Sequence, residues 1–226
     1  MADKPPFLVE AAIFDMDGLM LDTEGPAVFT WMRIARSMGL AVDMETALKT
    51  VGLDEPSTIA IIREAYGPDF PLDHVRQEWE RVIALDADKN GIPCRPGLIT
   101  LLDHLADLGI PLGVATSSSR EAALWKLERG GILERFPVLA CGNEVRRGKP
   151  APDIFLLAAE RLGRDPAGCV GFEDSPAGLR GLHAAGIRSI FVKDLVEPPE
   201  EVLRTVWRRY DNLAEAAPLF GPAQGR

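Results

Sequence analysis

Two acidic pairs stand where a catalytic or metal-binding site could form. The segment DMDG holds Asp15 and Asp17, and the segment FEDS holds Glu173 and Asp174. Carboxylates that meet at one place repel one another and need a cation between them. An all-oxygen ligand set favours Mg²⁺, which binds through a few carboxylates together with substrate phosphate. If the two pairs converge, the sequence predicts a magnesium site there.

A hydroxyl-rich segment and a lysine could hold the phosphate itself. Thr116 and Ser117 precede a predicted helix, whose first backbone N–H groups would bind an anion. Lys149 lies between Gly148 and Pro150, which would fix the direction of its ammonium group, a point charge suited to phosphate. A carboxylate that attacks a phosphate dianion meets repulsion of about 4 kcal/mol per unit-charge pair at about 4 Å. A divalent metal and a fixed lysine would offset this repulsion.

Structural interpretations of the same residues remain open. Asp15 and Asp17 could be turn residues or helix caps, and a lone lysine is ordinarily a solvated surface residue. The segment that starts at Asp15 begins like an EF-hand, but its twelfth position is Pro26, which cannot supply the bidentate carboxylate. Neither a P-loop nor a GxGxxG motif is present, so a nucleotide cofactor is not indicated.

The hydrophobic pattern predicts the elements that would bring these groups together. An apolar run at residues 8–14 is typical of a buried strand that ends at Asp15. Further strands are predicted at residues 110–115, 138–141, 169–172 and 189–192, and helices at 96–108, 120–129, 152–162, 176–185 and 200–209. This alternation indicates a Rossmann-like, three-layer α/β fold with a parallel sheet. Ligands bind beyond the carboxyl ends of such strands, which is where the polar groups stand.

Residues 22–91 interrupt this alternation with helical periodicity alone. We therefore predict a core of residues 1–21 and 92–226 and an inserted all-helical domain of residues 22–91, with hinges at Gly25 and Asn90-Gly91. Asp22, Thr23 and Glu24 would cap the first inserted helix or line the entrance to the site. The last segment, residues 215–226, is predicted to be a loose tail.

Composition limits the partners of this chain. Its 226 residues are 46% hydrophobic and 26% charged, as in ordinary globular proteins, and its formal charge is -9. An acidic chain is a poor match for nucleic acid or an anionic membrane surface. We expect no secretory leader, no membrane span, three unpaired cysteines, a cytoplasmic location, and a monomer or weak homodimer. His74, His104 and His183 form no cluster, and Trp31 and Trp79 are expected to pack, although either could face a substrate.

Four ordered motifs resemble those of the haloacid dehalogenase superfamily of hydrolases. They are the segment FDMDG, the strand that ends in Thr116-Ser117, the pair Lys149-Pro150 and the segment GFEDS, and they span nearly the whole chain. The inserted helices resemble the cap of that superfamily. The branch most similar to this chain holds β-phosphoglucomutase and phosphatases of small metabolites.

The resemblance implies a mechanism. Asp15 would be the nucleophile and form an aspartyl-phosphate, while Asp17 would be the general acid and base. Thr116 and Lys149 would be catalytic and would hold the phosphoryl oxygens, with Ser117 and Glu24 as further substrate-binding residues. Mg²⁺ would be bound by Asp15, the carbonyl of Asp17, Asp174 and, less strongly, Glu173.

The same resemblance separates the possible reactions. True dehalogenases lack the second aspartate, whereas Asp17 is present here. β-Phosphoglucomutase keeps a histidine and an arginine in its cap, at places that hold Ala27 and Glu55 in this chain. We therefore expect a phosphatase of small phosphorylated metabolites, with a hexose-phosphate mutase as the alternative and a non-catalytic phosphometabolite-binding protein as a third possibility.

Overall fold

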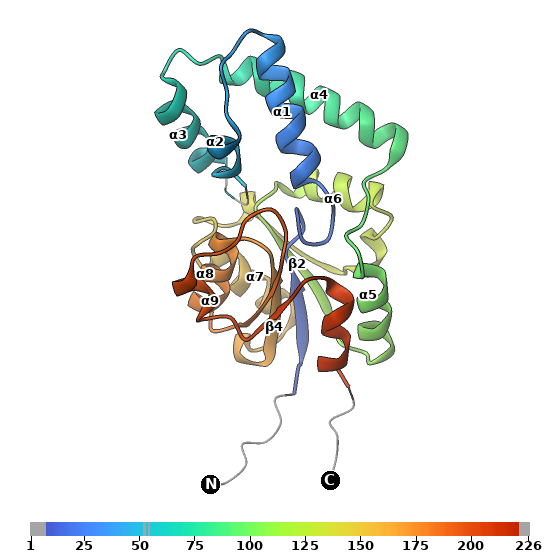
Figure 1. The fold of residues 1–226 in the computed structure, drawn as a ribbon. Coiled ribbons are helices and arrows are strands. Elements are labelled where there is room, and N and C mark those ends of the chain that lie inside the picture. The colour runs from blue at the N-terminus through green and yellow to red at the C-terminus, as the bar shows by residue number, and fades with distance from the viewer. Residues whose placement is uncertain (1–7, 52, 54, 222–226) are drawn as a thin grey trace.

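The computed structural model describes residues 8–51, 53 and 55–221, without the side chains of Glu24 and Glu55. A six-stranded sheet forms its centre (Figure 1), in the order β3-β2-β1-β4-β5-β6, with every neighbouring pair parallel. The strands are β1 (Ala11–Phe14), β2 (Leu112–Thr116), β3 (Val138–Cys141), β4 (Cys169–Glu173), β5 (Arg188–Val192) and β6 (Arg208–Tyr210). The predicted α/β class and parallel sheet are confirmed.

Helices cover both faces of the sheet, because successive strand residues point to opposite sides. In β1, Ala12 and Phe14 belong to one apolar cluster, and Ala11 and Ile13 belong to the other. The first face is covered by α5 (Leu98–Asp107), α6 (Arg120–Arg129) and the 3-10 helix η4 (Leu213–Leu219), and the second by α7 (Asp153–Leu162) and α8 (Pro176–Ala184). The three predicted layers are therefore present.

Four inserted helices lie above the carboxyl ends of the strands (Figure 1). They are α1 (Glu24–Ser37), α2 (Met44–Leu48), α3 (Glu55–Tyr66) and α4 (Leu72–Asn90). Their own apolar cluster is built on Met32, Ala35 and Val75, and Trp31 stacks on Phe70 with ring centroids 6.1 Å apart. We call residues 22–91 the cap; its division from the core at these bounds stays a prediction.

Two predicted segments near the C-terminus are wrong. The helix expected at residues 200–209 ends after one turn, α9 (Glu200–Leu203), and β6 follows it. Pairing explains this change, because β5 offers an open edge on which Ile190 pairs with Arg208. The loose tail expected at residues 215–226 is ordered as far as residue 221, where Phe220 is buried and its carbonyl lies 2.6 Å from His104 Nε2; residues 222–226 lie outside the described part.

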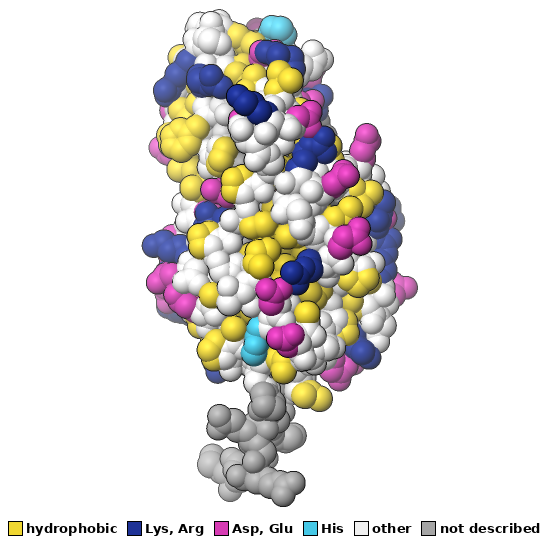
Figure 2. Space-filling view, turned by 90° about the vertical axis from the view of Figure 1, so that its right-hand side faces the viewer, with side chains coloured by type: hydrophobic (Ala, Val, Ile, Leu, Met, Phe, Trp, Pro, Cys, Tyr) yellow, Lys and Arg dark blue, Asp and Glu magenta, His cyan; other side chains and the backbone are white. Residues whose placement is uncertain are grey.

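The surface and the thiols agree with the composition. On the face shown in Figure 2, acidic and basic side chains are interspersed. Among the described helices, none combines the length and the apolar character that crossing a lipid bilayer requires. The cysteines Cys94, Cys141 and Cys169 are all free thiols.

The carboxylate of Glu144, shortly after β3, connects this strand to its neighbouring helices α6 and α7. Glu144 accepts hydrogen bonds from Arg120 Nε at 2.9 Å, from Arg161 at 2.8 Å and from the backbone N–H of Cys141 at 2.9 Å. The bonds from the two guanidinium groups, Arg161 first, lower the pKa of Glu144 to about 2. The folded protein therefore stabilises the ionised form of Glu144 more than the unfolded chain does.

Glu144→Gln is expected to lower the free energy of unfolding at pH 7 by about 1–2 kcal/mol, since solvent screens this partly exposed network. Because the pKa of Glu144 is lower in the folded protein, its carboxylate stabilises the fold at pH values above its unfolded pKa of about 4.3. The contribution falls as the pH drops toward the folded value of about 2. The difference between the urea midpoints of the parent and the variant should therefore shrink as the pH falls from 7 to 5 and 3. The exposed control Glu134→Gln should change none of them, and a deficit that is independent of pH would contradict the ionic origin.

Candidate active site

The loop after β1 directs the first acidic pair into a cavity. The backbone N–H of Asp15 donates to Phe172 O at 3.0 Å, which joins the end of β1 to β4. Gly18, with φ of 83°, turns the chain back, and the backbone N–H groups of Met20 and Leu21 both donate to Met16 O. A residue with a Cβ is strained in this left-handed conformation. Both Asp15 and Asp17 line the cavity.

Lys149 is buried against two carboxylates. Its ammonium group donates to a carboxylate oxygen of Asp15 and to Glu173 Oε1 at 2.6 Å, and its Nζ lies 5.0 Å from the centre of the Phe155 ring. Burial lowers the pKa of Lys149, but Asp15 and Glu173 raise it above its ordinary value, so the ammonium stays charged. Lys149 does not line the cavity itself. The predicted proximity of Lys149 and Asp15 is thus present in the fold, with the lysine behind the carboxylate.

Glu173 is held from the opposite side by the start of α8. Its Oε2 accepts hydrogen bonds from the backbone N–H of Asp174 at 2.9 Å and of Ser175 at 2.8 Å, and from the Ser175 hydroxyl at 2.9 Å. A Cβ at Gly178 would lie 1.7 Å from Glu173 Oε1, so only glycine leaves room for this carboxylate. Both oxygens of Glu173 are therefore already in contact with protein donors.

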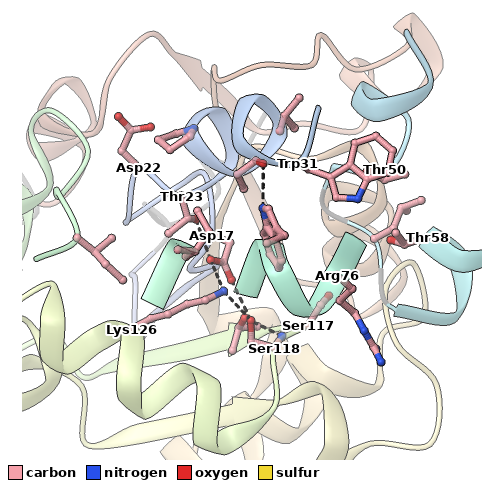
Figure 3. Close-up of a pocket in the computed structure, with 18 of the residues that line it drawn as sticks. Asp17, Asp22, Thr23, Trp31, Thr50, Thr58, Arg76, Ser117, Ser118 and Lys126 are labelled. Carbon is pink, nitrogen blue, oxygen red and sulfur yellow. Dashed lines mark hydrogen bonds and ion pairs between the residues drawn. The ribbon is translucent and has the colours of Figure 1, made fainter. Parts of the chain in front are cut away.

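The carboxylate of Asp17 is surrounded by three hydrogen-bond donors. The sequence predicts none of these three contacts. Its Oδ1 accepts from Lys126 Nζ at 2.7 Å and from the Thr23 hydroxyl at 2.8 Å, and its Oδ2 accepts from the Ser118 hydroxyl at 3.0 Å (Figure 3). Burial raises the pKa of Asp17, but Lys126 and these hydroxyls outweigh it and bring the pKa below its ordinary value. Asp17 is thereby favoured in its ionised form.

Lys126 gave no signal in the sequence, because a lysine two turns into a helix is ordinarily solvated. The sequence predicts Thr23 to be a helix cap or an entrance residue. It precedes α1 at the N-cap position but makes no capping hydrogen bond with its side chain, and its hydroxyl is directed to Asp17 instead. The side chain of Glu24, a predicted substrate ligand, lies outside the described part.

Thr116 ends β2 and Ser117 follows it, at the same edge of the sheet as the acidic groups, as predicted, and both residues line the cavity. Thr116 is 1% exposed, and its hydroxyl oxygen accepts from the backbone N–H of Ser118 at 3.1 Å. This bond shapes the turn that leads into α6. The turn is tight, since a Cβ at Gly142 would lie 2.2 Å from Ser117 O.

The acidic groups form a donor set that fits a divalent cation. Asp15, Glu173 and Asp174 are buried, and each offers an oxygen within 4.8 Å of the others. Burial raises the pKa of Asp15 well above its ordinary value; Lys149 opposes this, and the charges of Glu173 and Asp17 reinforce it. A cation would therefore favour the ionised form of Asp15. Two negative charges are in excess when all groups are ionised: Asp15, Asp17, Glu173 and Asp174 against Lys126 and Lys149.

The cavity lies between the strand ends and the cap and has a volume of about 470 Å³. Figure 3 shows Asp17, Ser118 and Lys126 together on the core side and Trp31 across the cavity on the cap side. Trp79 also lines it. The arrangement places two carboxylates, Asp15 and Asp17, each with its own hydrogen-bond donors, at the core end of a cavity.

Comparisons with known proteins agree with this geometry. A "phosphorylated carbohydrates phosphatase" from Thermotoga maritima is 34% identical over 187 residues, which are 81% of this chain and 84% of the relative. A "probable pseudouridine-5'-phosphatase" from Drosophila melanogaster is 33% identical over 205 residues, 86% of each chain. The crystal structure of CbbY from Rhodobacter sphaeroides in complex with phosphate has a TM-score of 0.77 at 28% identity and covers 92% of this chain and 96% of that chain.

The model of one protein family, haloacid dehalogenase-like hydrolase, matches residues 9–186. The match runs from β1 through the end of α8 and contains the cap. It therefore covers both walls of the cavity and every strand end that shapes it. On this ground the chain belongs to the haloacid dehalogenase-like hydrolases.

Proposed function

We propose that this hydrolase is a Mg²⁺-dependent phosphatase of small phosphorylated metabolites. The observation that carries the proposal is the convergence of four charged groups at the core end of the cavity: Asp15 and Asp174 line it, and Lys149 and Glu173 are buried next to Asp15. This is the charge arrangement that transfer of a phosphoryl group to a carboxylate needs. The two curated relatives described above are phosphatases by name, which supports the same reaction.

The reaction would proceed in two steps. An oxygen of Asp15 attacks phosphorus while the bond from phosphorus to the ester oxygen breaks, and the leaving oxygen takes a proton from Asp17. Water then attacks the aspartyl-phosphate and gives its proton to Asp17. The bond from phosphorus to Asp15 breaks, which restores the carboxylate and releases phosphate.

The remaining groups would hold charges in place during these steps. Lys149 keeps Asp15 oriented and, with Thr116 and Ser117, offsets the negative charge of the phosphoryl oxygens. Mg²⁺, when bound by Asp15, Asp174 and the carbonyl of Asp17, would supply further positive charge at those oxygens. As the ionised base, Asp17 suits the second step. For the first step it must carry a proton, which requires the contact with Lys126 to loosen.

Chelation of divalent metal with EDTA is expected to abolish phosphate release, and added Mg²⁺ is expected to restore it. Asp174→Asn should raise the Mg²⁺ concentration needed for half-maximal turnover by about 100-fold or more. Even the loss of a residue that only supports a metal ligand lowers metal affinity by about 10-fold to 100-fold. Release of inorganic phosphate from 4-nitrophenyl phosphate would measure both effects. Asp107→Asn, an exposed change at the end of α5, is the matched control. Full turnover in EDTA would contradict the metal requirement.

The products separate phosphatase from mutase. With a hexose 1-phosphate, a phosphatase releases inorganic phosphate, whereas a mutase accumulates the 6-phosphate. Ala27 lines the cavity at the place where the mutase keeps a cap histidine, and its methyl group can form no hydrogen bond that would retain a sugar phosphate. We therefore expect inorganic phosphate as the product; accumulation of the 6-phosphate without phosphate release would overturn this choice.

A further inference from the structure

Building on the phosphatase function proposed above, we propose that the organic part of the substrate is a planar aromatic ring system. The cavity has two chemically different ends. Its core end is charged and suits the phosphate group, as described. Its cap end is lined by apolar side chains from α1, α3, α4 and the segment before α3: Trp31, Leu53, Ile59, Ile62, Trp79 and Ile83. The phosphate position therefore directs the rest of the substrate against an apolar wall.

Several polar groups on the cap side of the cavity already have partners within the protein. Thr58, Asp73 and Arg76 also line this side, and Arg76 lies 3.7 Å from Asp73. The indole N–H of Trp79 donates to Ala27 O at 3.0 Å, so this side chain offers the substrate a ring face alone. The Thr50 hydroxyl donates to Ala47 O at 2.7 Å. Asp86 accepts from the side-chain amide of Asn90 at 2.7 Å. A sugar or polyol placed against the apolar wall would bury hydroxyl groups that find no partner on that wall, and each unpaired hydroxyl costs free energy.

A flat ring avoids this cost and gains contact area. Trp31 on α1, Trp79 on α4 and Trp125 on α6 all line the cavity, and all three are half-buried. Figure 3 places Trp31 across the cavity from Asp17 and Lys126. Ring stacking on such faces is favourable and tolerates different ring chemistries. A cavity of about 470 Å³ also lies within the range that accepts a ligand of this size.

Matched substrates test this inference on the unchanged protein. Riboflavin 5'-phosphate (FMN) and ribitol 5-phosphate share the phosphorylated chain and differ only in the ring system. Uridine 5'-monophosphate and ribose 5-phosphate form a second pair. With Mg²⁺ present, we expect kcat/KM to be about 10-fold to 100-fold higher for the ring-bearing member of each pair, the range that one or two stacking contacts give. Equal or higher values for the ringless members would overturn the proposal.

Variants locate the preference in the cavity. Trp31→Leu keeps an apolar side chain but removes the flat face, and it should lower the ratio of kcat/KM between FMN and ribitol 5-phosphate, mainly through a higher KM for FMN. Trp125→Leu tests the same prediction from the core side, independently of the folding of the cap. The matched control is Phe29→Leu on the outer surface of α1, where the ring is 64% exposed. An unchanged ratio in both tryptophan variants would contradict the proposed contacts.

A binding measurement separates this inference from the proposed function. Calorimetric titration of Asp15→Asn protein with FMN and with ribitol 5-phosphate needs no turnover. One outcome is that the Asp15→Asn protein binds FMN more tightly than ribitol 5-phosphate, while the parent protein releases phosphate from no ester. This outcome would support the ring site and refute the phosphatase. Release of phosphate from all esters with tighter binding of ribitol 5-phosphate would refute the ring site and leave the phosphatase standing.

Discussion

Asp15→Asn is expected to lower kcat for phosphate release by about 10⁴-fold or more, as the loss of a catalytic nucleophile does in other hydrolases. The amide cannot attack phosphorus, and it also removes one charge from the cluster that Lys149 and Asp174 share. The fold should survive, because asparagine has the same shape and the backbone N–H of residue 15 still donates to Phe172 O. Release of inorganic phosphate from 4-nitrophenyl phosphate, read beside the circular dichroism spectrum, measures both expectations.

Trapping the intermediate gives a direct control for that result. Acid quenching of the parent enzyme during turnover should yield a phosphorylated peptide that contains residue 15, and the variant should yield none. The exposed change Asp107→Asn should leave both the rate and the phosphopeptide as in the parent. If Asp15→Asn retains the parent rate, the nucleophile has been misassigned.

Lys149→Met is expected to damage both activity and stability. Asp15 and Glu173 would then face each other in a buried site without the ammonium that contacts both. Removal of one partner from a buried ion pair ordinarily costs about 3–5 kcal/mol, since the remaining charge is left uncompensated. We therefore expect a loss of unfolding free energy in this range in EDTA, together with loss of phosphate release.

Added Mg²⁺ should recover part of this lost stability, because a cation among Asp15, Glu173 and Asp174 takes over some of the charge compensation. Urea unfolding with EDTA and with Mg²⁺ measures the difference. The surface substitution Lys193→Met removes a lysine charge outside the cluster and should alter neither quantity. A Lys149→Met protein as stable as its parent in EDTA would show that the two carboxylates do not depend on this ammonium.

The two variants address different parts of one charge arrangement. In the proposed reaction Asp15 supplies the reacting oxygen, whereas Lys149 donates hydrogen bonds to both Asp15 and Glu173 and so fixes the position of Asp15. Glu173 is in turn fixed by the backbone N–H groups at the start of α8. Asp15 is therefore oriented by a series of buried contacts that continues into the core, and for this reason we expect a change at Lys149 to affect the fold as well as the reaction.

Much of the site follows from the order of elements along the chain. The apolar strand runs predict a parallel sheet, and parallel strands bring their carboxyl ends to one edge. Asp15, Thr116 and Asp174 each follow or end such a strand, so their proximity needs only the pairing of β1 with β2 and β4. The strand alternation and the four motifs were thus sufficient for the α/β class and for the acidic cluster.

Contacts between side chains on distant elements needed the folded structure. No local pattern joins Lys126 to Asp17, because their contact depends on the direction in which α6 leaves the sheet. The edge strand β6 replaced a predicted helix because pairing with β5 outweighed local helical spacing. The apolar character of the cap end of the cavity likewise depends on which faces of α1, α3 and α4 are turned toward the core. Periodicity along a helix shows that one face is apolar, and only packing determines what that face meets.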